Sequence, residues 1–170
     1  MPIVSILTFF VTFLLTLFAG LYISLIFYNK RTLTTTDKFI RQASELAPTV
    51  FKNIKLRYWT TRGPKTQISP NNRCDLYVFD NYLAIVRRQD FIFKVFFAPV
   101  MLTSDLATTK NNFNYLDCYK PDYIHFNRLM KGQVDIKLKD PISRRWKIDI
   151  TFKELTSEQT NQLYKIKNWC

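Results

Sequence analysis

The first part of the chain is continuously apolar. Ile3 to Tyr28 is a run of 26 residues, and no charged side chain occurs before Lys30. At about 1.5 Å per residue this run makes roughly 39 Å of helix, against a hydrocarbon core of about 30 Å. We therefore predict a transmembrane anchor over residues 1–29. A cleavable signal peptide is the alternative, but it requires a basic n-region and an apolar core of only about 7–15 residues.

Small and hydroxyl side chains recur on one face of this predicted helix. The candidates for helix packing are Ser5, Thr8, Thr12, Thr16 and Ala19, with Gly20 and Ser24 beside them. Such a face lets a second helix approach closely and offers hydroxyl groups for hydrogen bonds between helices. The alternative is that each hydroxyl bonds to the carbonyl four residues earlier in its own helix.

The next segment, residues 30–48, is polar and basic. We expect Lys30 to Thr36 to be a link at the membrane surface, and Thr36 to cap a short amphipathic helix over Asp37–Ala47 that stops at Pro48. The apolar face of this helix comprises Phe39, Ile40, Ala43, Leu46 and Ala47. It packs on the following domain or lies on lipid headgroups.

From Thr49 the hydrophobic pattern has the period of β-strands. We expect a strand over Phe51–Thr60, then a loop containing Gly63, Pro64 and Pro70. Five further strands lie within 76–79, 82–86, 91–102, 123–129 and 134–138. In a last strand, apolar residues alternate with charged or hydroxyl ones, as in an antiparallel sheet with one wet face; the apolar positions are Trp146, Ile148, Ile150 and Phe152, and the others are Lys147, Asp149 and Thr151. Thr156 and Gln159 form a capping box that opens a final helix to Trp169.

This order of elements over Thr49–Trp169 resembles the pleckstrin-homology-like domain, including its small bacterial, membrane-anchored type. The resemblance rests on the hairpin Leu76–Arg88 and on the final strand and helix, Arg145–Trp169. It implies a fold class of an N-terminal transmembrane helix plus a mainly-β domain at 49–170, an antiparallel barrel of about seven strands closed by a C-terminal helix. A lipocalin-like or other small antiparallel barrel is the alternative.

Positive charge is concentrated next to the anchor. The chain carries a net charge of +12, and Lys30 to Lys65 holds nine Lys and Arg but two Asp and Glu. Lys30 and Arg31 follow the apolar run directly, so the positive-inside rule predicts an N-terminus outside and a cytoplasmic C-terminal domain at the cell membrane, the inner membrane if the source is bacterial. Lys30, Arg31, Lys38 and Arg41 are the first candidates for contact with anionic lipid headgroups. These charges are also explained by topology and solubility alone.

Phosphoinositide-binding members of the resembled family use bases on the first two strands and the loop between them. The matching region offers Lys55 and Arg57 on the first strand, then Arg62, Lys65 and Arg73 in the loop, as further lipid candidates. The second strand departs from the pattern, because Asp75 to Val78 contains no base.

Other chemistry has little support in the sequence. His125 is the one histidine, Cys74, Cys118 and Cys170 show no ligand spacing, and the three glycines form no phosphate loop. We therefore predict no catalytic residue, cofactor or metal, and we expect the protein not to be an enzyme. We do not expect nucleic acid to be a ligand of a membrane-anchored chain. A lipid-proximal binding or scaffolding module is the leading hypothesis, and the alternative is a homo-oligomer or an accessory subunit recruited by a membrane protein through the helix.

Overall fold

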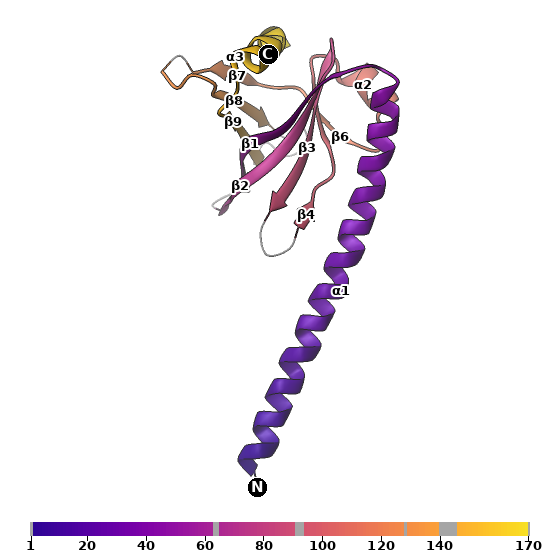
Figure 1. The fold of residues 1–170 in the computed structure, drawn as a ribbon, viewed down its shortest axis with the longest axis vertical. Coiled ribbons are helices and arrows are strands. Elements are labelled where there is room, and N and C mark those ends of the chain that lie inside the picture. Colours follow the sequence, from indigo (N-terminus) through magenta and orange to yellow (C-terminus); the bar gives the residue numbers. More distant parts are fainter. Residues whose placement is uncertain (1, 63–64, 91–93, 128, 140–145, 170) are drawn as a thin grey trace.

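A single long helix and a β domain make up the structure. The computed structural model describes residues 2–62, 65–90, 94–127, 129–139 and 146–169, with side chains for all of these except 2–5, 61–62, 65–71, 89–90, 94–96 and 146–147. Helix α1 (Pro2–Ser44) is 43 residues long, and its N-terminal half stands clear of the sheet (Figure 1). In the described part of the chain it is the one helix long and apolar enough to cross a membrane. The prediction of a long apolar N-terminal helix is confirmed.

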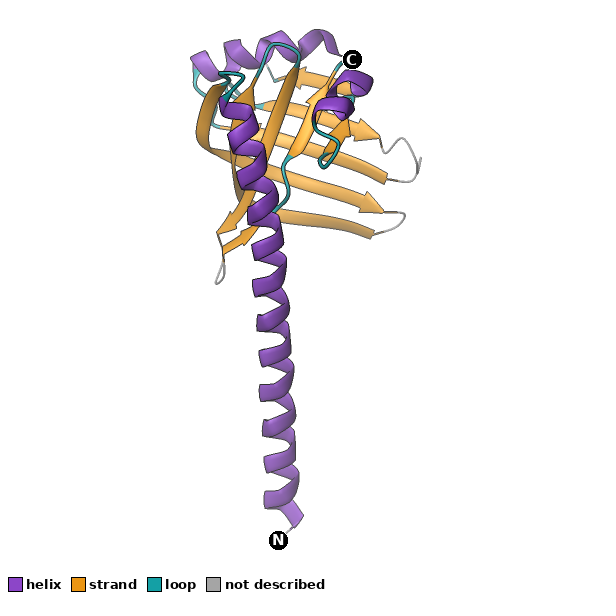
Figure 2. Cartoon of the chain, turned by 90° about the vertical axis from the view of Figure 1, so that its right-hand side faces the viewer, coloured by secondary structure: helices purple, strands orange, loops and turns teal. Residues whose placement is uncertain are grey.

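Nine strands form one curled sheet, a half-barrel (Figures 1 and 2). The strands are β1 (Thr49–Arg62), β2 (Lys65–Val78), β3 (Tyr82–Asp90), β4 (Lys94–Phe96), β5 (Val100–Thr103), β6 (Asp117–Tyr119), β7 (Tyr123–Phe126), β8 (Val134–Lys139) and β9 (Trp146–Lys153). Their order is β6-β5-β3-β2-β1-β9-β8-β7, with β4 also paired to β3. The helical segments are α2 (Leu106–Asn112), α3 (Ser157–Leu163) and the 3-10 helix η1 (Tyr164–Trp169).

The inner face of the sheet carries the main core. Alternate residues such as Leu76 and Val78, or Ile148 and Ile150, point into it and are buried. The C-terminal helical segment closes this core with Leu163, Ile166 and Trp169. Thr156 and Gln159 form the predicted capping box at the start of α3. The closing helix and the alternation of the last two strands are therefore confirmed.

The outer face of the sheet carries a second core, which is covered by the end of α1 (Figure 2). Thr32, Thr36, Phe39 and Ala43 are buried, and their spacing of four, three and four residues makes one stripe along the helix. The stripe faces residues of β3, β5 and β6 and the α2 segment, including Ala84, Met101, Cys118 and Phe113. The middle of β3 and the whole of β5 are consequently buried on both faces.

The predicted link and cap at the start of residues 30–48 are wrong. Residues 30–36 are helical, and the hydroxyl groups of Thr34, Thr35 and Thr36 each donate to the carbonyl oxygen four residues earlier, at 2.9–3.2 Å. A threonine that bonds back in this way fits inside a helix. Packing of the buried stripe then favours the helix over a flexible link, and α1 continues from the apolar run to the domain without a break.

Three features of the β domain also differ from the predictions. The expected loop with Pro70 is part of a hairpin of two 14-residue strands, in which Pro70 and Asn71 lie opposite Arg57 as a β-bulge. The sheet has nine strands rather than about seven, and it is mixed, because β5 and β6 are parallel. Among the described strands no ladder joins β6 to β7, so the sheet is a half-barrel rather than a closed antiparallel barrel.

Candidate membrane-facing surface and adjoining pocket

Polar contacts fasten the end of α1 to the domain. Tyr115 donates a hydrogen bond from its hydroxyl to Gln42 Oε1 at 2.8 Å, and Gln42 Nε2 donates to the carbonyl oxygen of Asn112 at 2.9 Å. Lys38 Nζ lies 4.1 Å from the centroid of the Tyr115 ring. With the buried stripe, these contacts fix how the domain sits on the helix. Because α1 is unbroken, they also fix the domain relative to the apolar half of α1.

The four candidate cations of α1 lie at two heights along the helix. Lys30 and Arg31 are exposed at the end of the apolar run. Lys38 and Arg41 are also exposed, but they lie about 12 and 17 Å farther along the axis than Lys30 at 1.5 Å per residue. Surface charges interact over about 8 Å at physiological salt. A bilayer that ends near Lys30 therefore attracts the first pair more strongly than the second.

Several strand ends meet at one end of the sheet, which we call the hairpin edge. In Figure 1 the ends of β2 and β4 lie on the side of the domain from which the N-terminal half of α1 extends, while Figure 2 shows that the long strands run mostly across the helix axis. Arg62 pairs with Lys65 across the β1–β2 hairpin, and Asp90 pairs with Lys94 across β3 and β4. On the other side of β1, Arg62 pairs with Trp146, and Lys139 pairs with Lys147. The hairpin edge thus gathers the basic positions Arg62, Lys65, Lys94, Lys139 and Lys147.

The remaining strand bases are not part of this edge. Arg73 lies in the middle of β2, where it is half-buried and lies opposite Lys55 of β1 and Arg88 of β3 in the strand register. Lys55 forms an ion pair with Glu154 at 2.6 Å, and the Arg57 guanidinium lies 4.1 Å from the Trp59 ring centroid. The structure therefore brings Arg62 and Lys65 together and separates them from Arg73. The sequence did not single out Lys94, Lys139 or Lys147, because only the register of the strands places them beside Arg62.

The hydroxyl stripe of α1 uses its donors inside the helix. Thr12 donates to the carbonyl oxygen of Thr8, and Thr16 to that of Thr12, both at 2.8 Å. The side chain of Ser5 lies outside the described residues. Around Gly20, no atom comes within 4 Å of an added Cβ, so the close-packing face at Ala19, Gly20 and Ser24 is uncovered. The side chains of this stripe are small enough for close helix packing, but Thr12 and Thr16 already donate their hydroxyl hydrogens to carbonyl oxygens of their own helix.

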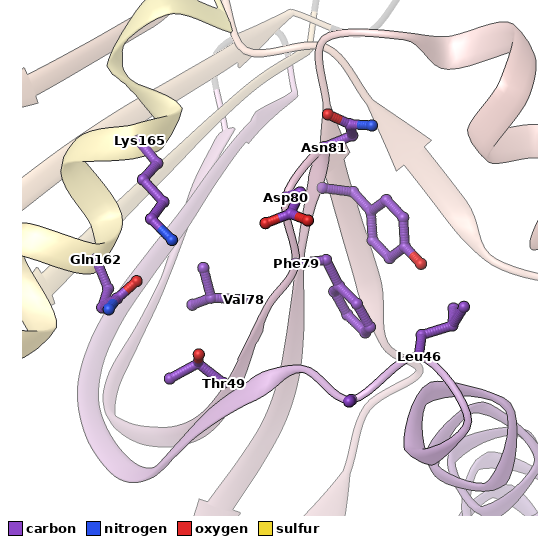
Figure 3. A pocket seen from close by; sticks show the side chains of 10 residues that line it. Leu46, Thr49, Val78, Phe79, Asp80, Asn81, Gln162 and Lys165 are labelled. Carbon is purple, nitrogen blue, oxygen red and sulfur yellow. The ribbon is translucent and has the colours of Figure 1, made fainter.

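A pocket of about 270 Å³ opens at the other end of the sheet (Figure 3). It lies between the α1–β1 connection, the β2–β3 hairpin and the C-terminal helical segment. Gln162 and Lys165 face Val78 and Asp80 across it, and Gln162 Oε1 is buried without a hydrogen-bond partner in the described part of the structure. Its lining residues are Leu46, Ala47, Thr49, Val78, Phe79, Asp80, Asn81, Tyr82, Gln162 and Lys165. Three segments distant in sequence form this pocket, so the sequence predicted only one of its walls, the hairpin within Leu76–Arg88.

The remaining titratable candidates are structural or solvated. His125 is exposed on β7 and stacks on Tyr123 with 5.9 Å between the ring centroids. Cys74 and Cys118 are buried, and burial raises the pKa of both thiols. Among the described residues no group of three His, Cys, Asp or Glu side chains could hold a metal ion.

Comparison of the chain with protein-family models, curated proteins and solved structures finds no match. The proposed function therefore rests on the geometry of the chain itself.

Proposed function

We propose that the protein is a single-pass membrane protein whose β domain is a binding or scaffolding module of pleckstrin-homology-like type, held close to anionic lipid. The observation that supports this function is the continuity of α1, which runs from the apolar stretch into the outer core of the domain. The basic pair Lys30-Arg31 favours a cytoplasmic domain with the N-terminus outside. The hairpin and the strand–helix unit support the family type, although the second strand lacks the bases of phosphoinositide binders.

Lipid contact depends on where the hairpin edge lies. Figure 1 shows the β2 and β4 ends of this edge on the side of the domain from which the apolar half of α1 extends. Each Lys or Arg near an anionic leaflet contributes about 1 kcal/mol of attraction. Arg62 and Lys65 therefore act with Lys30 and Arg31 as lipid contacts, and Lys94, Lys139 and Lys147 join them. The pocket of Figure 3 lies at the opposite end and leaves the module free to bind a soluble partner there.

A pair of fluorescent labels on the full chain tests the orientation. Lys139→Cys places the label at the hairpin edge, where the side chain is 70% exposed, and Lys131→Cys places it before the other end of β8. Both variants carry Cys170→Ser, and the chain is reconstituted in phosphatidylcholine vesicles with or without phosphatidylglycerol, containing a headgroup quencher. We expect quenching at residue 139 that increases with phosphatidylglycerol and decreases with salt, and little at residue 131. Equal quenching at both positions would refute the orientation.

Two further variants separate the effect of the domain's distance from the bilayer from the effect of the positive charge at the hairpin edge. A net-neutral helical heptad inserted between Arg31 and Thr32 raises the domain by about 10 Å while turning it by only about 20°. This lift exceeds the screening length of about 8 Å, so quenching at residue 139 should fall to the level of residue 131. Neutralising Arg62, Lys65 and Lys94 to Gln should remove the dependence on phosphatidylglycerol. The control neutralises Lys131, Lys153 and Lys165 to Gln, which changes the same charge at positions away from the edge.

Recruitment by a membrane partner through α1 is the second candidate function. At about 100° per residue, the stripe of Thr8, Thr12 and Thr16 lies roughly 150° around the helix from the buried stripe of Thr32, Thr36, Phe39 and Ala43. A second helix can therefore pack on the first stripe without meeting the domain. Replacing Thr12 and Thr16 by Leu should weaken cross-linking between neighbouring helices in vesicles if this face is used. Unchanged cross-linking would exclude it.

A further inference from the structure

The inner face of the half-barrel changes character along the strands. Toward the C-terminal helices it is apolar, whereas toward the hairpin edge it carries polar side chains from four strands. This polar cluster consists of Tyr58 of β1, Asn72 of β2, Arg87 of β3 and Asp117 of β6. Residues paired directly across a ladder point to the same face. Arg87 pairs with buried Cys74, and Asp117 pairs with buried Val100, both of the main core.

Arg87 is held by aromatic rings. Its guanidinium carbon lies 3.9 Å from the centroid of the Tyr58 ring and 4.9 Å from that of Phe97. The backbone N–H of Phe97 donates to the carbonyl oxygen of Arg87 at 3.2 Å, which keeps Phe97 beside it. Cation–π contacts of this kind stabilise a guanidinium, and the Tyr58 hydroxyl also shares a hydrogen bond with it, but neither gives the Nε–H an acceptor.

No acceptor in the described structure pairs with the Nε–H of Arg87. Nε is buried without a hydrogen-bond partner, and no described carboxylate lies within 4.0 Å of the guanidinium. Buried polar groups almost always have a partner, and a half-buried cation without a counter-charge is costly. By contrast, Lys55 and Lys139 each have a carboxylate partner. The side chain is half-buried, so part of it stays within reach of solvent.

We propose that the polar cluster binds a phosphate group through the Arg87 guanidinium, with the Tyr58 hydroxyl beside it. A guanidinium fixed between rings presents its edge to a phosphate, the anion for which its fork of N–H donors is suited. Arg87 lies three residues before the end of β3 at Asp90, next to the basic hairpin edge, whose positive potential attracts anions. The phosphate belongs to a lipid headgroup or to a free phosphate compound.

The negative charge of Asp117 should weaken phosphate binding, so its removal provides a test in which binding should become tighter. Burial raises the pKa of Tyr58, with Arg87 lowering it and the Asp117 carboxylate adding to the rise, so both charges act on the cluster. Asp117→Asn removes the negative charge and should tighten phosphate binding. Arg87→Gln should weaken it about tenfold or more, as expected when a charged hydrogen bond is lost. Arg57→Gln is the matched control, because Arg57 also stacks on a ring but is exposed.

The experiment follows the Arg Nε–H signals of the full chain by NMR in lipid nanodiscs. Arg87→Lys assigns the Arg87 signal by its loss. Inorganic phosphate is titrated into phosphatidylcholine discs, and discs containing phosphatidylglycerol are compared without phosphate. A shift of the Arg87 signal with inorganic phosphate indicates a site for free phosphate, and a shift only with phosphatidylglycerol indicates the lipid headgroup.

An Arg87 signal that moves in neither arm overturns the proposal, and so does an equal shift of the Arg57 signal. The titrations use the wild-type chain, and only the assignment of the Arg87 signal uses a variant, the conservative Arg87→Lys. The proposal is also independent of lipid contact by the hairpin edge. Neutralising Arg62, Lys65 and Lys94 leaves Arg87 in place, so failure of one proposal is distinguishable from failure of the other.

Discussion

Phe39 is the residue on which the docking of α1 depends most. Its side chain is fully buried in the outer core, with its ring edge-on to Tyr77 at 5.3 Å and 6.0 Å from Phe113 between centroids. Replacing a fully buried Phe by Ala costs about 3–5 kcal/mol, through lost apolar contact and the cavity that remains. Each aromatic pair adds about 0.5–1.5 kcal/mol to such contacts. Phe39→Ala should therefore lose a large part of the stability of a domain worth about 5–15 kcal/mol.

The adjacent Ile40 offers a matched control, because its side chain is 38% exposed on the same turn of α1. Ile40→Ala should cost about 0.5 kcal/mol, as at an ordinary surface position. The assay is denaturant unfolding of the full chain in detergent, together with limited proteolysis at the α1–β1 connection. We expect Phe39→Ala to lower the unfolding midpoint and to speed cleavage there. If both variants behave alike, α1 is not packed on the outer core as described.

Further predictions concern glycine, cysteine and topology. Gly132 has a φ of +76°, and an added Cβ would collide with the backbone after β9. Gly132→Ala should therefore lower the free energy of unfolding in denaturant by about 1–3 kcal/mol or more. Gly20→Ala should not lower it, because the space around Gly20 is open. Burial and raised pKa values should protect Cys74 and Cys118, so residue-resolved mass spectrometry should find alkylation at mildly alkaline pH only after unfolding. A reporter fused to the C-terminus should report a cytoplasmic location, and activity of an export-dependent reporter would reverse the topology.

Elements with one buried and one wet face could be predicted from the sequence. In β8, Val134, Ile136 and Leu138 are buried while the residues between them are half-buried or exposed, and β9 repeats the pattern at Ile148 and Ile150. Alternation of this kind directly encodes both the strand and its inner face. The long apolar N-terminal helix could equally be predicted, because a run of 26 residues without a charged side chain favours one continuous helix.

Prediction failed where tertiary contacts override the local signal. Leu83, Ala84 and Ile85 are all buried, because α1 covers the outer face of β3. The three residues are all apolar, so the sequence pattern does not show which element covers the outer face. Pro70 suggested a loop, yet a β-bulge accommodates it within a long hairpin. The threonines of residues 32–36 suggested a link, yet packing of Thr32 and Thr36 on the domain keeps them helical. The basic hairpin edge was missed for a similar reason. Its basic residues are distant in sequence, and only the register of the strands brings them together.

The tilt of α1 should control how near the hairpin edge comes to lipid. Five strand spacings of about 4.8 Å separate β5, under the end of α1, from β8, which carries Lys139, so this part of the edge lies about 24 Å along the sheet from β5. A change in tilt of about 20° then moves that part by about 8 Å, comparable to the screening length of about 8 Å. Because α1 is longer than a bilayer core, thicker bilayers should reduce its tilt. Quenching of the label at residue 139 should therefore differ between short-chain and long-chain vesicles, while a label at Arg31→Cys, close to the helix axis, should change little. Equal responses at the two positions would show that the domain swings independently of the helix.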